Sequence, residues 1–368
     1  MAYINGNEIL FSAVVTGGSG DKAIINGLID RTIESMDIPK GVTKVGSGAF
    51  RDCTNLASVT IPNGITAIGY ESFRNCILLK EVVLPDGVTK IEEMAFRFCT
   101  GLEKVNIPNS VESIGPEAFV SCSKLQSVVI PEGIYTIARA TFKSCSNLRS
   151  VALPSTIRTI DEEAFRSAPL NVQMNLPDGL KYINNMAFRF SSIYTLTIPA
   201  TVISIGSEAY YSCTSLSSVE LKGGGSVGSY AFYNCTSLGT VKIGEGVTSI
   251  GDMAFAMCPS IKNLSLSGAT KLNSIGNNAF PSATQVKSLT IPASVKTIGS
   301  GALGIGTNNI PATLTMESST PPTIGTRLFG EATGDHKVSA IYVPANAVTA
   351  YKNATNWSVY ADIIRAKA

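Results

Sequence analysis

The sequence predicts a repeat solenoid: a right-handed superhelix with a parallel β-sheet on its concave face and short helical or 3₁₀ arcs on its convex side. Three observations predict it. Aromatic residues recur about every 23 residues, all eight cysteines lie in one column behind them, and each period holds one short alternating apolar segment. A chain of 368 residues would otherwise divide into two or three globular domains, but a repeat makes each period one structural unit.

The aromatic column defines thirteen copies of the repeat, and most of them carry a cysteine three residues later. The column consists of Phe50, Phe73, Phe96, Phe119, Phe142, Phe165, Phe188, Tyr210, Phe232, Phe255, Phe280, Leu303 and Phe329. The cysteines are Cys53, Cys76, Cys99, Cys122, Cys145, Cys213, Cys235 and Cys258. We expect both columns to be buried between neighbouring copies.

Each copy is predicted to form the same elements in the same order. A V-x-I segment alternates apolar and polar residues, which is the period of a half-buried strand. Proline, such as Pro62 or Pro85, ends the strand because it has no N–H and a fixed φ. The next apolar pair, Ile65 and Ile68, turns inward again. Glycine, such as Gly69, is expected to allow a positive φ before an Ala-Phe or similar pair starts the arc.

The best copies read LASVTIPNGITAIGYESFRNC (residues 56–76) and LEKVNIPNSVESIGPEAFVSC (residues 102–122). This pattern resembles the BspA-like class of bacterial leucine-rich repeats over roughly residues 33–344. Residues 341–364 also resemble the closing segment common in that family. The resemblance implies a leucine-rich-repeat solenoid and, for function, a surface adhesin or a host-interaction protein.

We expect three segments along the chain. Residues 1–30 form an N-terminal cap or attachment segment, residues 31–330 hold about thirteen leucine-rich repeats, and residues 331–368 form a C-terminal cap. One copy buries too few side chains to offset the ordering of its own backbone, so the copies depend on their neighbours and the ends need covers. Trp357, the chain's only tryptophan, is expected to cover the last coil together with Tyr351.

The outward positions of the V-x-I strands would line the concave face. They are polar, small and nearly uncharged, which suits a protein or a polysaccharide as partner. The candidate binding surface comprises Ser58, Thr60, Glu81, Lys104, Asn106, Ser127, Gln173, Asn175, Thr195, Thr197, Glu220 and Lys242.

A second candidate is a basic stripe directly after the aromatic column. It comprises Arg51, Arg74, Arg97, Lys143, Arg166 and Arg189, and acidic residues precede the aromatic column in the same copies. The stripe would bind an anionic glycan or an acidic protein surface if its charges were free. We favour the alternative, in which the stripe pairs with those acids.

The cysteine column raises two functional alternatives, a metal site and a disulfide staple. C-x-x-C spacing is absent and His336 is the one histidine, so zinc is not expected. Cysteines of neighbouring copies would lie about 5 Å apart, but in-register side chains point the same way, which is poor disulfide geometry. We interpret the cysteines as small, buried and inert, and Ala168 replaces one of them.

No catalytic, cofactor-binding or metal-ligating residues are predicted, and we expect no enzyme. His336 stands alone beside Asp335, and neither G-x-S-x-G nor H-E-x-x-H occurs. The glycine-rich residues 15–23 and 223–229 match neither the P-loop nor the dinucleotide fingerprint, so they are interpreted as loops. Repeated coils also lack the singular pocket that most enzymes need, which leaves a carboxylate-pair glycoside hydrolase as the weakest hypothesis.

Composition and charge narrow the classes of partner that we expect. The formal net charge is only +2, which argues against nucleic acid. No run of about 18 apolar residues exists, so membrane insertion is not expected. The N-terminus lacks the basic region of a signal peptide, which fits cytosolic synthesis with virion or surface delivery. The family resemblance instead implies a secreted or cell-surface protein, and the sequence leaves both the compartment and the oligomeric state open.

The preferred function is therefore a non-enzymatic binding or adhesion module that presents an extended surface to a protein or polysaccharide. The alternative is a phage or prophage structural or receptor-binding component attached through its N-terminal segment. This alternative takes its motivation from the missing signal peptide and from the opening stretch, which resembles leaders of repeat proteins in prophage-like gene neighbourhoods.

Overall fold

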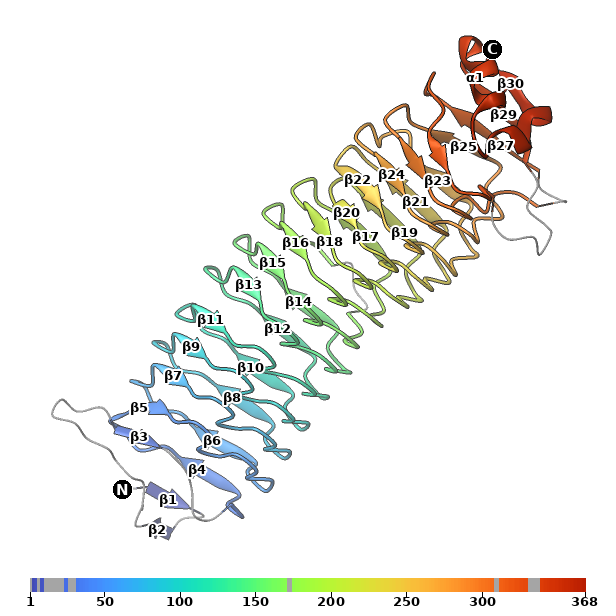
Figure 1. The fold of residues 1–368 in the computed structure, drawn as a ribbon. Helices are drawn as coiled ribbons and strands as arrows, with labels where there is room; N and C mark the ends of the chain where they lie inside the picture. Colours follow the sequence, from blue (N-terminus) through green and yellow to red (C-terminus); the bar gives the residue numbers. More distant parts are fainter. Residues whose placement is uncertain are drawn as a thin grey trace. The chain divides into compact units, whose positions relative to one another are not determined.

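The structure, a computed structural model, describes residues 2–4, 7–9, 23–25, 31–170, 174–307, 311–329 and 338–368. The chain divides into two compact units, Met1–Gly179 and Leu180–Ala368. Each unit is a parallel β-solenoid, which confirms the predicted fold class. Each regular coil, meaning one repeat, contributes a first strand, a second strand and a run of turns (Figure 1).

In the N-terminal unit the strands form two sets. The first strands are β4 (Ser35–Asp37), β6 (Ser58–Thr60), β8 (Glu81–Val83), β10 (Lys104–Asn106), β12 (Ser127–Val129) and β14 (Ser150–Ala152). The second strands are β3 (Ala23–Ile25), β5 (Val42–Val45), β7 (Ala67–Ile68), β9 (Lys90–Ile91), β11 (Ser113–Ile114), β13 (Thr136–Ile137) and β15 (Thr159–Ile160). An antiparallel hairpin of β1 (Ala2–Ile4) and β2 (Asn7–Ile9) precedes them. Because β3 pairs with β5, the second ladder already includes residues 23–25.

The C-terminal unit repeats this arrangement and adds helices. Its first strands are β17 (Thr195–Ile198), β19 (Ser218–Leu221), β21 (Thr240–Ile243), β23 (Asn263–Ser265), β25 (Ser288–Ile291), β27 (Ala312–Met316), β29 (Val338–Val343) and β30 (Ile364–Ala366). Its second strands are β16 (Tyr182–Ile183), β18 (Ser204–Ile205), β20 (Gly225–Val227), β22 (Val247–Ile250), β24 (Ser274–Ile275), β26 (Thr297–Ile298) and β28 (Thr323–Ile324). The helices are η1 (Ala345–Ala347), α1 (Val348–Asn353) and η2 (Ser358–Ile363).

The arc around the aromatic column is a run of turns, not the helical or 3₁₀ segment that the sequence predicts. The N–H groups of Glu71, Phe73 and Asn75 donate to carbonyls of the next coil at 2.8–3.1 Å, whereas the N–H groups between them bond within their own coil. Glu71 and Asn75 also have φ of 50° and 62°. A helix needs right-handed φ at every residue and bonds along its own axis, so alternate bonding between coils excludes it.

The glycine before the arc has a different role from the predicted one. Gly69 and Gly115 are not among the residues with positive φ. A Cβ on Gly69 would instead lie 2.5 Å from the Val45 carbonyl oxygen, and one on Gly115 would lie 2.5 Å from the Glu93 nitrogen. Glycine is therefore required here by the close approach of two backbones.

The aromatic column is buried and stacked within each unit. In the N-terminal unit, neighbouring ring centroids from Phe50 to Phe165 lie 4.9–5.5 Å apart and the rings are nearly parallel. In the C-terminal unit, the centroids from Phe188 to Phe280 lie 4.8–5.1 Å apart. These separations suit offset aromatic stacking, so each ring fills the space left by its neighbours.

The cysteine column is buried, and none of its eight cysteines forms a disulfide. Most of these thiols donate to the aromatic-column carbonyl of the preceding coil; Cys99 Sγ, for example, lies 3.0 Å from the Phe73 oxygen. Burial raises the pKa of Cys145 and Cys213 to about 12. A thiol that stays protonated is a poor nucleophile and metal ligand. The cysteine side chains therefore pack as part of the hydrophobic core, and most of them also donate a weak hydrogen bond.

Tyr210 is the one tyrosine of the aromatic column, and it provides a stability prediction. Its ring is fully buried, and its hydroxyl has no hydrogen-bond partner among the described residues. Tyr210→Phe is expected to raise the free energy of unfolding by about 1 kcal/mol, because it removes an unsatisfied buried group. Tyr351→Phe is the matched control: that hydroxyl donates to the Ser318 carbonyl at 3.0 Å, so the same change should destabilise. Urea unfolding of both variants checks the opposite signs; a loss of stability in Tyr210→Phe contradicts the prediction.

Residues 338–368 pack against the final coil and supply partners to its backbone. Trp357 Nε1 donates to the Pro322 carbonyl at 2.8 Å, and Asn356 Nδ2 donates to the Ile324 carbonyl at 2.9 Å. The Tyr360 hydroxyl accepts the Leu328 N–H at 3.0 Å. Trp357 is fully buried. We infer that this segment closes the C-terminal end of the solenoid.

Candidate functional site

The predicted binding surface lies on the outward side of the first strands, apart from Asn175, which belongs to no strand; we call it the first-strand surface. Ser58, Thr60, Glu81, Lys104, Asn106, Ser127, Asn175, Thr197 and Lys242 are exposed, and Thr195 and Glu220 are half-buried. Gln173 lies outside the described residues. Parallel register aligns these side chains in rows: Thr197, Glu220 and Lys242 are successive partners in one unit, and Glu81 adjoins Lys104 in the other.

Two features of this surface could not be predicted from the sequence. Asn106 is exposed, but its amide bonds the backbone of Leu84, accepting from the N–H at 2.6 Å and donating to the carbonyl at 3.1 Å. It therefore ties two coils together and offers little to a ligand. The second feature is apolar: Val83 and Val129 are 60% and 68% exposed, so the surface carries isolated aliphatic contacts beside its polar ones.

A groove of about 510 Å³ is hollowed into the first-strand surface of the C-terminal unit. We call it the lysine groove, because Lys242, Lys262 and Lys287 line it. It lies where one sheet ends at β23 and the next begins at β25. Thr240, Asn263, Ser265, Gln285 and Ser288 supply hydroxyl and amide groups to its walls. Lys242 belongs to the predicted surface, whereas Lys262 and Lys287 were missed because they precede the alternating strand residues.

The basic stripe is fully paired. The ion pairs are Arg51–Glu71 at 2.8 Å, Arg74–Glu71 at 2.7 Å, Arg97–Glu117 at 2.6 Å, Lys143–Glu163 at 2.6 Å, Arg166–Glu163, and Arg189–Glu208 at 2.5 Å. Burial opposes the ionisation of Glu163, but the hydrogen bonds and charges of Lys143 and Arg166 outweigh it, so the pKa of this carboxyl lies below its usual value. The stripe therefore presents compensated charge, which weakens it as an anion site.

Aromatic side chains replace the stripe in the following coils of the C-terminal unit. Arg189 lies over the rings of Phe190 and Tyr211, with its guanidinium carbon 4.8 and 4.5 Å from their centroids. Tyr211 stacks on Tyr233 at 5.0 Å, and Tyr230 adjoins Tyr233 at 5.5 Å. The sequence signal was the presence of Tyr211 and Tyr233 in the stripe's column. Only Tyr211 and Tyr233 stack face to face, and Phe190 and Tyr230 remain partly exposed at the edge of the cluster.

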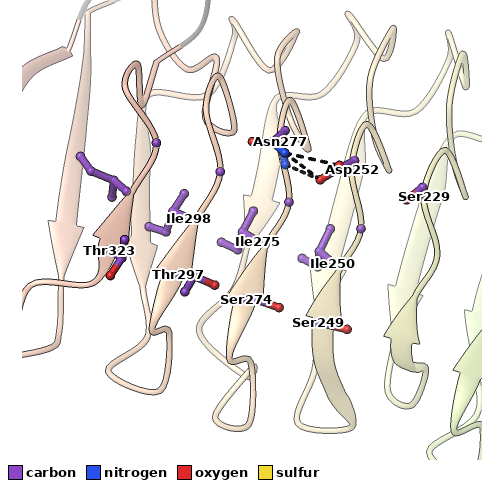
Figure 2. Close-up of a pocket in the computed structure, with 15 residues that line it drawn as sticks. Ser229, Ser249, Ile250, Asp252, Ser274, Ile275, Asn277, Thr297, Ile298 and Thr323 are labelled. Carbon is purple, nitrogen blue, oxygen red and sulfur yellow. Dashed lines mark hydrogen bonds between the residues drawn. The ribbon is translucent and has the colours of Figure 1, made fainter. Parts of the chain in front are cut away.

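A second groove, of about 590 Å³, runs along the second strands of the C-terminal unit (Figure 2). Ser249, Ser274 and Thr297 form a row of hydroxyls at corresponding positions of successive coils. Asp252 and Asn277 face each other there, and the Asp252 carboxylate accepts the Asn277 backbone N–H at 2.6 Å. Gly251, Gly276, Gly299 and Gly325 also line this groove. Its one carboxylate is thus engaged with the neighbouring coil.

Few acidic side chains line the two grooves. The lysine groove has no acidic lining residue, and the second-strand groove has only Asp252. Within the described ranges, no three His, Cys, Asp or Glu residues gather as metal ligands would. Among those same residues no helix has the length and apolarity to cross a membrane. His336, Asp335 and residues 15–22 of the glycine-rich N-terminal segment lie outside the described side chains.

Comparisons with known proteins agree with this geometry. A sequence model of the BspA type Leucine rich repeat region matches residues 29–149, 136–225 and 222–333. A leucine-rich repeat protein from Bacteroides ovatus is similar in structure, with 26% identity, a TM-score of 0.71, and coverage of 92% of this chain and 84% of that chain. A leucine rich cell surface protein from Faecalibacterium prausnitzii has 28% identity and a TM-score of 0.48, covering 81% of this chain and 90% of that chain. The curated proteins gave no match.

Proposed function

Because the chain belongs to the BspA-type leucine-rich-repeat family, we propose that it is a non-enzymatic binding or adhesion module. It engages a protein or polysaccharide through the first-strand surface. The observation that supports this most is the alignment, within each unit, of exposed polar side chains from successive coils. A repeated row of this kind suits an extended partner, since each added coil adds another similar contact.

Catalysis has little support from either groove. Both grooves are open, and neither brings together the acid, base or nucleophile that a reaction would need. Attachment to a virion, the alternative drawn from the N-terminal sequence, has no observation in its favour. Adhesion to a cell or matrix surface is the form of binding that we propose.

The proposal is tested with a glycan array and a pull-down from bacterial surface extracts, followed by paired variants. Thr60→Glu with Thr197→Glu adds bulk and negative charge to the first-strand surface, once in each unit. Thr136→Glu with Thr297→Glu makes the same change on exposed positions of second strands. We expect the first pair to weaken binding by on the order of tenfold and the second to leave it unchanged. Folded wild-type protein that binds neither array nor extract would overturn the proposal, as would a loss confined to the second pair.

A further inference from the structure

The lysine groove differs from the basic stripe in the state of its charges. Lys242, Lys262 and Lys287 are exposed, and no carboxylate in the described part of the chain pairs with their ammonium groups. Glu220 is the register neighbour of Lys242, yet no ion pair joins them. The groove therefore holds three positive charges that form no ion pair, one from each of three successive coils.

The walls of the groove favour one class of anion. Thr240, Asn263, Ser265, Gln285 and Ser288 line the groove beside the lysines. Asn263 Nδ2 donates to the Thr240 hydroxyl at 3.4 Å and Gln285 Nε2 donates to the Pro259 carbonyl at 3.0 Å, which leaves hydroxyl groups and amide oxygens to meet a ligand. Tight protein interfaces centre on aromatic or aliphatic anchors in dry pockets, and here Val241 and Leu264 are buried in their strands. Lysine ammonium groups are hydrated point charges that bind oxyanions without a fixed geometry. An acidic sugar chain carries many hydroxyl groups and has negative charges at intervals, so it matches both the polar walls and the three lysines.

From this arrangement we infer that the lysine groove binds an anionic polysaccharide, one that carries carboxylate or sulfate groups along its length. The inference rests on the proposed binding function and names its partner class. Lys242 lies within β21, whereas Lys262 and Lys287 directly precede β23 and β25. The three lysines, from three successive coils, therefore meet negative groups distributed along an extended chain and not a single anion. Binding is electrostatic at an exposed site and therefore weakens as salt is added.

The test uses the full chain and defined polymers: dextran sulfate, polygalacturonate, neutral dextran and poly-glutamate. The groove variant is Lys242→Gln/Lys262→Gln/Lys287→Gln. The control variant, Lys222→Gln/Lys296→Gln/Lys352→Gln, removes the same charge from exposed lysines of the same unit that do not line the groove. Surface plasmon resonance at low and physiological salt measures binding, and circular dichroism checks folding.

Wild-type protein is expected to bind one or both acidic polysaccharides and not neutral dextran. The groove variant should lose on the order of tenfold in affinity, which is about 1.4 kcal/mol, and the control variant should keep its affinity. Equal losses in both variants, absence of binding by wild type, or equal binding of poly-glutamate would overturn the inference. If wild-type protein binds glycans on the array and the groove variant binds them equally well, the assignment of the groove as the binding site is wrong, and the proposed binding function stands.

Discussion

Replacing Phe119 with alanine is expected to lower the free energy of unfolding by about 3–5 kcal/mol. Its ring is fully buried and stacks on Phe96 and Phe142, with centroids 5.3 and 5.5 Å away. The backbone around it is held by hydrogen bonds to the next coil, so the walls of the new cavity are not free to collapse. The expected loss of stability therefore combines the lost free energy of burying the ring with the cost of the cavity that remains.

Two controls separate this effect from mutation in general. Phe119→Leu keeps most of the volume and should cost under about 1.5 kcal/mol. Thr60→Ala changes an exposed side chain and should lie within about 0.5 kcal/mol of wild type. Urea unfolding followed by far-UV circular dichroism gives the comparison. Similar losses for Phe119→Ala and Thr60→Ala would show that the aromatic column does not carry the core.

The buried columns could be predicted from sequence because they are side-chain patterns with a fixed period. Phe119 and Cys122 recur at constant spacing, and identical residues at one position of stacked coils must meet one another. The V-x-I alternation likewise separates Val128, which is buried, from Ser127 and Val129, which are exposed. No partner outside the repeat is needed for these inferences.

The backbone of the arc could not be predicted in the same way. Its conformation depends on hydrogen bonds to the next coil, such as that from the Phe73 N–H to the Ala95 carbonyl, and these contacts are remote in sequence. Local propensity favours a helical turn there, but tertiary bonding overrides it. The second strands were missed for a related reason: two-residue strands such as β7 give no alternation to detect.

The sequence could predict which face of the sheet points outward, but it could not predict where on that face a groove would form. Alternation identifies Lys242 as outward, yet the groove beside it depends on the sheet boundary between β23 and β25. Whether a charged side chain forms an ion pair also depends on distances in the folded structure, which the sequence does not give. Glu71 lies between Arg51 and Arg74, whereas Lys262 pairs with no acid among the described residues.

Trp357→Ala is expected to cost about 3–5 kcal/mol, although this residue lies near the chain end, where substitutions are usually tolerated. The indole is fully buried, packs edge-on against Tyr351 at 4.9 Å and donates to the Pro322 carbonyl. Removing it opens the last coil to water and leaves that carbonyl without its partner. Far-UV circular dichroism during urea unfolding measures the loss.

Trp357→Phe separates the two contributions, because it keeps an aromatic ring and removes the N–H; it should cost about 1–3 kcal/mol. Trp357 is the chain's only tryptophan, so wild-type fluorescence reports unfolding of this segment alone. If the segment closes the solenoid, the fluorescence transition should coincide with loss of the C-terminal coils, since an uncovered coil loses the neighbour that stabilises it. A fluorescence transition at much lower urea, with the circular dichroism of Trp357→Ala unchanged, would instead make residues 338–368 an appendage on a solenoid that ends without them.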